Sequence, residues 1–248
     1  MKKHGCLFVE DIPVLNNEEN SMYYSKNHKG LVFVDRNMGE LEFSGTCGIY
    51  AQDTEIWNPD ENWKEKFTTV TVCNGITEIC AGVLEQFPNV KKLNLSKSLT
   101  CIEMTDALKT LLLTNNVLVH AAYGSCGDAF AQAHGLRFLP KNIELGWHRN
   151  EVHDESTKLI LRFHEDGTTD LLIDIFTAGV SAGSSGGASL ERPMPSEYAL
   201  GCTLKEFADM FPTQYREQIM NNPEVKIFLE REAERKMKTK ERRMSDGR

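Results

Sequence analysis

One serine of this chain lies in a sequence motif that is typical of catalytic nucleophiles. Residues 179–183 read GVSAG, the GxSxG pattern of a nucleophile elbow, and they follow a predicted strand, as an elbow requires. A serine hydrolase of the usual order also needs a histidine later in the chain, and none follows Ser181. The run of Gly and Ser that continues to Ser189 is a poor start for the supporting helix. We therefore interpret residues 179–189 as a loop or linker, and keep a hydrolase using Ser181 as the enzymatic alternative.

A group of histidines and carboxylates lies between residues 148 and 164. Its members are His148, Glu151, His153, Asp154 and His164. Imidazole and carboxylate groups together are usual ligands of zinc and of non-haem iron. The spacing matches no helical metal motif, however, and polar turns beside a hairpin produce such groups without a ligand. We expect no metal and no other cofactor, with His148, His153 and His164 as the candidate ligands if an ion does bind.

Composition and charge describe the chain that must position these residues. It has 248 residues, of which 40% are hydrophobic and 26% charged, as is usual for a folded globular protein. The net charge of −8 disfavours a general nucleic-acid binder. Residues 235–243 nevertheless hold six Lys or Arg against one Glu, a local charge of +5. A second alternative is therefore an accessory protein that reaches nucleic acid or a membrane surface through this basic tail.

The N-terminus and the cysteines bear on localisation. Two lysines are followed by Glu10 and Asp11 before any long apolar stretch, so we expect no cleaved signal peptide. No stretch approaches the roughly 18 apolar residues of a membrane-spanning helix. The seven cysteines include no CxxC pair, which favours reduced thiols. We expect a soluble, cytoplasmic protein.

The middle of the chain contains an internal repeat with an offset of 23 residues. Each unit begins with a short strand whose alternate residues enter the core, and a bend, a second apolar pair and a helical return follow. One unit cannot bury these residues alone, whereas stacked parallel units can. With this offset four pairs of apolar residues coincide: Val70 with Leu93, Val72 with Leu95, Ile76 with Leu99, and Ile79 with Ile102.

These residues carry a resemblance. The segment NGITEICAGVLEQFPNVKKLNLSKSLTCIEM, residues 74–104, resembles the repeats of the bacterial BspA-like leucine-rich-repeat family, which look like GVTSIGxxAFxxCxxLxxVxLPxSVTxI. Residues 41–52 are similar to the strand that often precedes such repeats. Residues 119–140 are similar to the family's terminal segment, where Ser125 and Asp128 form a helix-capping pattern. The resemblance covers residues 41–140 and implies a short solenoid.

Outward positions on the repeat strands are the candidate binding residues, because solenoids present an extended sheet surface. They are Thr71, Lys92, Asn94 and His120. The alternative for each is that it merely faces water.

The flanking segments should form further elements. Residues 30–43 predict a hairpin, and residues 46–66 predict a polar loop with Trp57 and Trp63 packing back on the body. Residues 158–176 predict a second hairpin that turns at residues 165–167.

Two helices should follow near the end of the chain. Thr203 and Glu206 form a capping box for a helix that stops near Pro212. A final helix can start at Pro223, and we predict that Phe228 and Leu229 on its apolar stripe contact a partner.

Together these features predict an α+β fold built on a short leucine-rich-repeat solenoid of two or three repeats, each a β-strand plus a helical turn. Residues 1–66 form an N-terminal hairpin and capping segment, residues 67–140 the repeats with a terminal cap, and residues 141–248 a β-hairpin, a Gly/Ser loop and a helical tail. The expected function is non-enzymatic protein–protein interaction or scaffolding. The partner is a protein of unknown identity, or a second copy of the chain.

Deleting residues 1–45 should unfold the repeats, because too few units remain to bury the core without the N-terminal hairpin. Thermal unfolding of the truncated chain measures this, and an unchanged melting transition would refute it.

Overall fold

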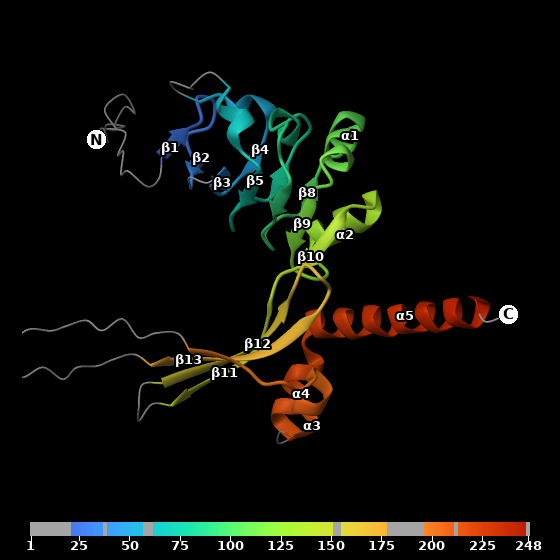
Figure 1. Ribbon diagram of the computed structural model, residues 1–248. Coiled ribbons are helices and arrows are strands. Elements are labelled where there is room, and N and C mark those ends of the chain that lie inside the picture. Colours follow the sequence, from blue (N-terminus) through green and yellow to red (C-terminus); the bar gives the residue numbers. More distant parts are fainter. Residues whose placement is uncertain are drawn as a thin grey trace, which may run out of the picture. The chain divides into compact units, whose positions relative to one another are not determined.

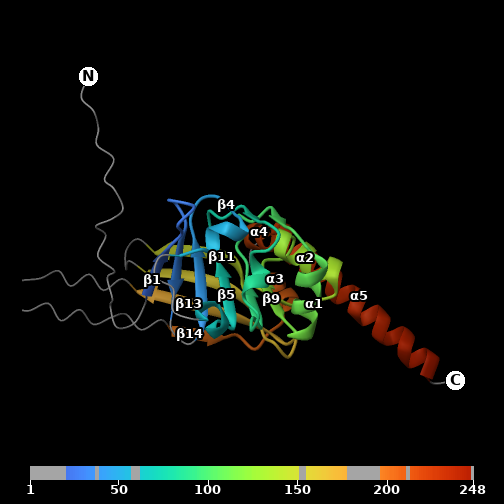
Figure 2. The same cartoon turned by 90° about the horizontal axis from the view of Figure 1, so that it is seen from above.

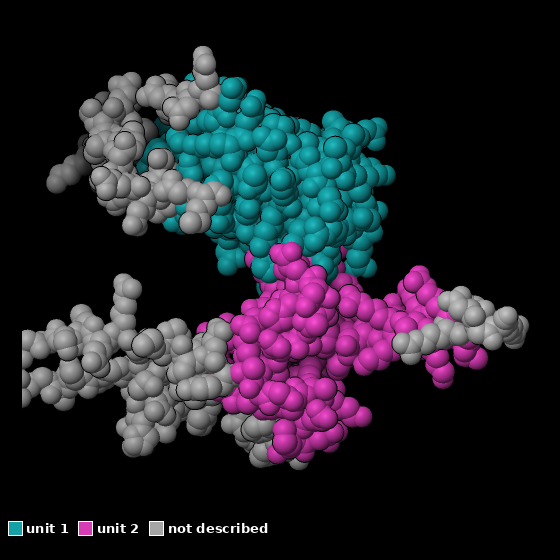
Figure 3. Space-filling view, viewed as in Figure 1, with its two compact units in different colours: residues 1–120, 129–138 teal, residues 121–128, 139–248 magenta. Residues whose placement is uncertain are grey.

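The structure is a computed structural model in which six stretches of the chain are described: residues 21–36, 39–56, 62–150, 155–177, 196–210 and 213–246 (Figure 1). These stretches form an α+β fold, with strands in three sheets and five α-helices. The chain divides into two compact units (Figure 3). The first comprises residues 1–120 and 129–138, and the second residues 121–128 and 139–248. None of the described helices is both long and apolar enough to cross a bilayer.

The seven-stranded sheet contains the strands predicted from the repeats. In spatial order they are β1 (Ser21–Tyr24), β2 (Val32–Asp35), β3 (Glu40–Ser44), β5 (Thr69–Val72), β7 (Lys92–Asn94), β9 (Leu118–Ala121) and β10 (Arg137–Pro140). β1, β2 and β3 pair antiparallel, which confirms the first predicted hairpin. β3 pairs parallel with β5, β5 with β7, and β7 with β9. Parallel pairing lets each strand place its inward residues directly beside those of the next.

The register of this sheet follows the 23-residue offset. Val70 lies opposite Leu93, and in a second, three-stranded sheet Ile79 lies opposite Ile102. That sheet consists of β4 (Gly48–Ile49), β6 (Glu78–Ile79) and β8 (Cys101–Ile102), all parallel. The predicted alignment of these two pairs is therefore confirmed.

Residues 46–66 are not the simple loop that we predicted. They contain β4 and two 3₁₀-helices, η2 (Ala51–Thr54) and η3 (Trp63–Lys66). β3 and β4 continue the parallel stack, since Leu41 lies opposite Val70 and Ile49 opposite Ile79. These offsets are 29 and 30 residues, so a search at a period of 23 residues does not find them.

Aromatic rings pack together at the N-terminal end of the core of the first unit. Trp63 is buried, as predicted, and Trp57 lies outside the described residues. The Trp63 ring lies 5.7 to 6.3 Å, between centroids, from four others: Tyr23, Phe33, Phe67 and Phe87. The helical return of the first repeat is short, with the 3₁₀-helix η4 (Leu84–Gln86), and it buries Val83, Leu84, Phe87 and Val90.

Two helices follow the repeat strands. α1 (Asp106–Thr114) is capped by Thr105, whose hydroxyl accepts the Leu108 N–H at 3.0 Å. α2 (Cys126–His134) has the predicted cap, because the Asp128 N–H donates to Ser125 Oγ at 3.4 Å. It ends before Gly135, which has a φ of +65° that favours glycine.

The second unit is built on an antiparallel sheet and three helices. The sheet consists of β11 (Ile143–Asn150), β12 (Glu155–Phe163), β13 (Thr169–Thr177) and β14 (Ser196–Ala199). The helices are α3 (Leu204–Met210), α4 (Thr213–Asn221) and α5 (Pro223–Asp246). β12 and β13 confirm the second predicted hairpin. The capping box of α3 is also confirmed, with Thr203 N–H donating to Glu206 Oε2 at 2.8 Å and Glu206 N–H to Thr203 Oγ1 at 3.3 Å.

One buried ion pair holds α5 in the second unit. Both nitrogens of the Arg231 fork donate to Asp128, at 2.7 and 3.0 Å, and the Asp128 side chain is only 1% exposed. Asp128 also accepts the Gly124 N–H at 2.8 Å. The guanidinium lies 4.8 Å from the centroid of the Tyr123 ring. The first turns of α5 are thus fixed to residues 121–128 by charge, hydrogen bonds and ring contact together.

Replacing Arg231 with Ala should lower the free energy of unfolding by about 3 kcal/mol, because a buried carboxylate loses its counter-charge. Urea unfolding measures the change. Arg216→Ala is the matched control, since Arg216 pairs with Asp209 at the surface, where such a pair contributes at most about 1 kcal/mol. Equal effects of the two variants would contradict the structural role of Arg231.

Candidate functional site

The outward face of the parallel strands brings together the four residues predicted there. Alternate residues of a strand point to opposite faces, so the neighbours of the buried Val70 and Leu93 point outward. In register they form two rows. The first row is Glu40, Thr69 and Lys92, and the second is Glu42, Thr71, Asn94 and His120.

Four of these side chains are joined by hydrogen bonds into what we call the polar ladder: Glu40, Thr71, Asn94 and His120. The Thr71 hydroxyl and Glu40 Oε1 are 2.6 Å apart, and Asn94 Nδ2 and Thr71 Oγ1 are 2.9 Å apart. Asn94 Oδ1 and His120 Nδ1 are 3.2 Å apart. The ladder crosses four adjacent strands, and each of its members is partly exposed.

The chemistry of the groups gives the ladder one direction. A carboxylate only accepts, so the single hydroxyl hydrogen of Thr71 goes to Glu40. Thr71 must then accept from the amide nitrogen of Asn94, which turns the amide oxygen toward His120. His120 Nδ1 therefore carries the hydrogen and donates it. Every donor in the ladder points toward Glu40.

The outward face becomes apolar toward the N-terminal hairpin. Glu42 lies opposite Val34, which in turn lies opposite Met22, and cross-strand partners share a face. Met22 is 47% exposed. Glu42 itself pairs with Arg36 at 2.8 Å. Neither Glu40 nor Glu42 was predicted as a site residue, because the offset that places β3 beside β5 differs from that of the repeats.

The predicted residues of α5 lie at a groove in the second unit. Phe228 is only 6% exposed and packs against Tyr123 and Phe163, with ring centroids 6.3 and 5.4 Å away. Leu229 is half-buried. Both line a groove of about 390 Å³ with apolar side chains from β12, β13 and α3: Leu161, Leu171 and Leu204. The same groove is edged by the charged residues Lys205, Glu232 and Lys236.

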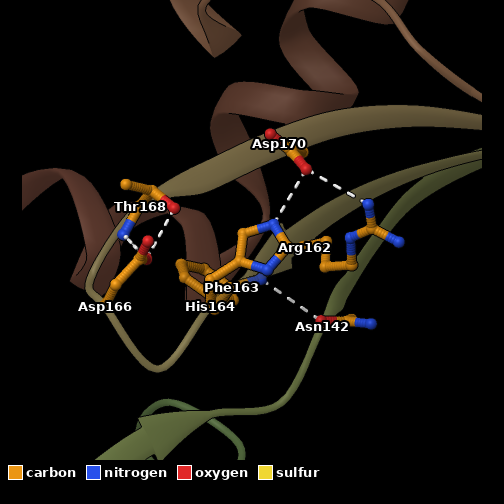
Figure 4. Close-up of polar contacts among 7 residues, drawn as sticks. All are labelled: Asn142, Arg162, Phe163, His164, Asp166, Thr168 and Asp170. Atoms are coloured by element: carbon orange, nitrogen blue, oxygen red, sulfur yellow. Dashed lines mark hydrogen bonds and ion pairs between the residues drawn. The ribbon is translucent and has the colours of Figure 1, made fainter.

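His164 is held by a hydrogen bond at the turn between β12 and β13 (Figure 4). Its Nε2 donates to Asp170 Oδ2 at 2.8 Å, and Arg162 Nη2 donates to the same oxygen at 3.1 Å. The hydrogen bond from His164, and then that from Arg162, holds the pKa of Asp170 below its ordinary value. The carboxylate is therefore the shared acceptor of an imidazole and a guanidinium.

The register of the second sheet places two of the candidate histidines along the chain. His148 lies opposite Thr157 on β12, seven residues before His164. At about 3.3 Å per residue this separation is about 23 Å, so one ion cannot bind both histidines. Within the described residues, no three His, Cys, Asp or Glu side chains are placed to hold a metal. His153 and Ser181 lie outside the described residues.

Comparisons with known proteins give a distant likeness among solved structures. No family model matches the chain, and no curated protein matches it. Among solved structures, the chain is similar to a leucine-rich repeat protein from Eubacterium ventriosum, with 21% identity and a TM-score of 0.26. The match covers 34% of this chain and 22% of the length of that protein.

The contacts of Asp170 predict a pH dependence of stability. Because its folded pKa is lowered, its stabilising contribution is present above the unfolded pKa of about 3.9. That contribution is lost as the pH falls through the folded pKa. Asp170→Asn should therefore be less stable than the parent chain at neutral pH and equally stable in strong acid. Urea unfolding at several pH values measures this, and the control is Glu165→Gln in the adjacent turn. A deficit that persists at the lowest pH would contradict the role of the charge.

Proposed function

We propose that this chain is a non-enzymatic protein-interaction module, built on a short leucine-rich-repeat solenoid of the BspA-like type, that binds a protein through the outward face of its parallel strands. The observation that carries the proposal is the polar ladder. Its four side chains come from four strands that are far apart in the sequence, and all point to one face.

The ladder supports binding because its side chains are already ordered. Holding a polar side chain in one conformation normally costs free energy when a partner binds. Here each side chain is held by the next one, so part of the loss of side-chain entropy already occurs when the protein folds and does not oppose binding. Three steps between neighbouring strands span about 14 Å, enough for a peptide strand or loop to lie across them.

The face also has the mixed chemistry of a protein-binding surface. The ladder and Lys92 supply polar contacts, and Met22 adds an exposed apolar side chain beside them. The carboxylates of Glu40 and Glu42 at one end disfavour a nucleic-acid backbone. A protein surface that presents hydrogen-bond donors toward Glu40 fits this arrangement best.

The stack has enough turns to support the solenoid interpretation. A solenoid usually needs about three repeats before its core is stable. β3 with β4, β5 with β6, and β7 with β8 provide three turns, and β9 adds a further strand. The N-terminal segment therefore contributes one turn of the solenoid and also covers its end.

Affinity purification of the tagged full chain from its native host tests the proposal. Asn94→Ala combined with His120→Ala should reduce recovery of the partner by about tenfold, as expected when central contacts are lost. The matched control is Lys109→Ala with Thr114→Ala, two exposed residues of α1 away from the sheet face. Thermal unfolding checks that both double variants fold. Recovery of the chain alone, or equal recovery of a partner with the ladder variant, would overturn the proposal.

A further inference from the structure

The groove beside α5 continues beyond the residues already described. A second hollow, of about 140 Å³, adjoins it and shares Leu204, Lys205 and Leu229 with it. Ala208 and Met220 add apolar lining on α3 and α4. The two hollows lie next to each other in the second unit, and Leu229 lines both. We call the pair of hollows the α5 groove.

At its other end the α5 groove leads onto a basic surface. Lys236 lines the groove and also lines a shallow hollow with Arg235, Thr239 and Lys240. Both views of the chain show α5 running out past the sheet and helices of the second unit (Figures 1 and 2). Every residue from 233 to 242 is exposed, and these ten include five Lys or Arg against two Glu.

The helix dipole does not account for this positive charge. Cations complement the dipole only in the last turn of a helix, and α5 ends at Asp246. Arg235 and Lys236 lie about three turns before that end. Lys236 pairs with Glu232 at 3.4 Å, but such an exposed pair contributes little to stability. The basic surface beside the groove therefore calls for an explanation other than the stability of the helix.

We propose that the α5 groove binds an acidic amphipathic segment of a protein partner, with apolar side chains in the groove and carboxylates on the basic surface. A hollow of this volume with leucine and phenylalanine lining suits apolar side chains. The neighbouring cations complement acidic residues that follow the apolar anchors. A nucleic acid fits less well, because it would leave the apolar lining unused and meet a chain of net charge −8. This surface belongs to the second unit and goes beyond the function proposed for the sheet face.

A synthetic peptide tests the groove on the full chain. The probe carries leucines at helical i, i+3, i+4 and i+7 spacing with glutamates elsewhere, and a fluorescent label for anisotropy. One comparison peptide has lysine in place of every glutamate, and another has serine in place of every leucine. Only the peptide with both leucine and glutamate should bind well, with an affinity that falls as salt is added.

Variants of the chain locate the binding. Leu229→Asp should weaken binding of the peptide by about tenfold or more, the loss expected for one buried leucine contact. The double variant Lys236→Glu with Lys240→Glu should also bind the peptide more weakly, and its affinity should depend less on the salt concentration. Lys226→Glu, an exposed lysine on the same helix that lines none of these hollows, is the matched control and should bind normally. Thermal unfolding confirms that each variant is folded, and Asn94→Ala should leave this affinity unchanged, which separates the test from that of the sheet face.

Three results would overturn the proposal. The lysine or serine peptide could bind as tightly as the probe. A single-stranded oligonucleotide could bind with dependence on Lys236 and Lys240 but not on Leu229, which would indicate a nucleic-acid site. Analytical ultracentrifugation could show a dimer that Leu229→Asp abolishes, which would indicate a second copy in the groove.

Discussion

Parallel pairing of β3, β5 and β7 in one register is the constraint on which the first unit depends. Each strand is only three to five residues long, so no strand could bury its inward side chains alone. Stacking places Leu41 beside Val70 and Val70 beside Leu93, all fully buried. A slip of one residue would turn the apolar side chains outward and the polar ladder inward. The core and the candidate binding face are therefore two results of the same register.

The second unit uses a different principle. An ion pair to Asp128 and a group of aromatic rings hold α5 in place, rather than repeated apolar rows. Asp128 serves the start of α2 and the fixing of α5 at once, because its two oxygens accept from Gly124 and from Arg231. Tyr123 and Phe163 supply the apolar contacts around Phe228. A few residues between 121 and 128 thus determine where the groove-forming part of α5 lies.

Much of the fold could be predicted from local signals. The caps of α2 and α3, the two hairpins and the start of α5 at Pro223 all depend on residues close together in the sequence, and the structure has each of them. The elements missed have weaker signals. α4 buries Ile219 but shows no clear apolar period, and β4 is only two residues long.

The residues of the candidate sites also differ in whether they could be predicted from the sequence. Thr71, Lys92, Asn94 and His120 could be selected because outward positions follow from the repeat. Glu40 could not, because the offset from β3 to β5 is set by the segment between them and not by the period. The hydrogen bond of His164 to Asp170 depends on the turn of a hairpin, so a linear list of histidines and carboxylates gives the residue types without their partners.

The direction of the polar ladder has a consequence for substitution. Each member must match the donor or the acceptor that its neighbour offers. Asp in place of Asn94 would set a carboxylate, which only accepts, against the Thr71 hydroxyl, whose single hydrogen already goes to Glu40. Exchanging one amide nitrogen for oxygen would therefore break the order of the ladder, although the size of the side chain stays almost the same.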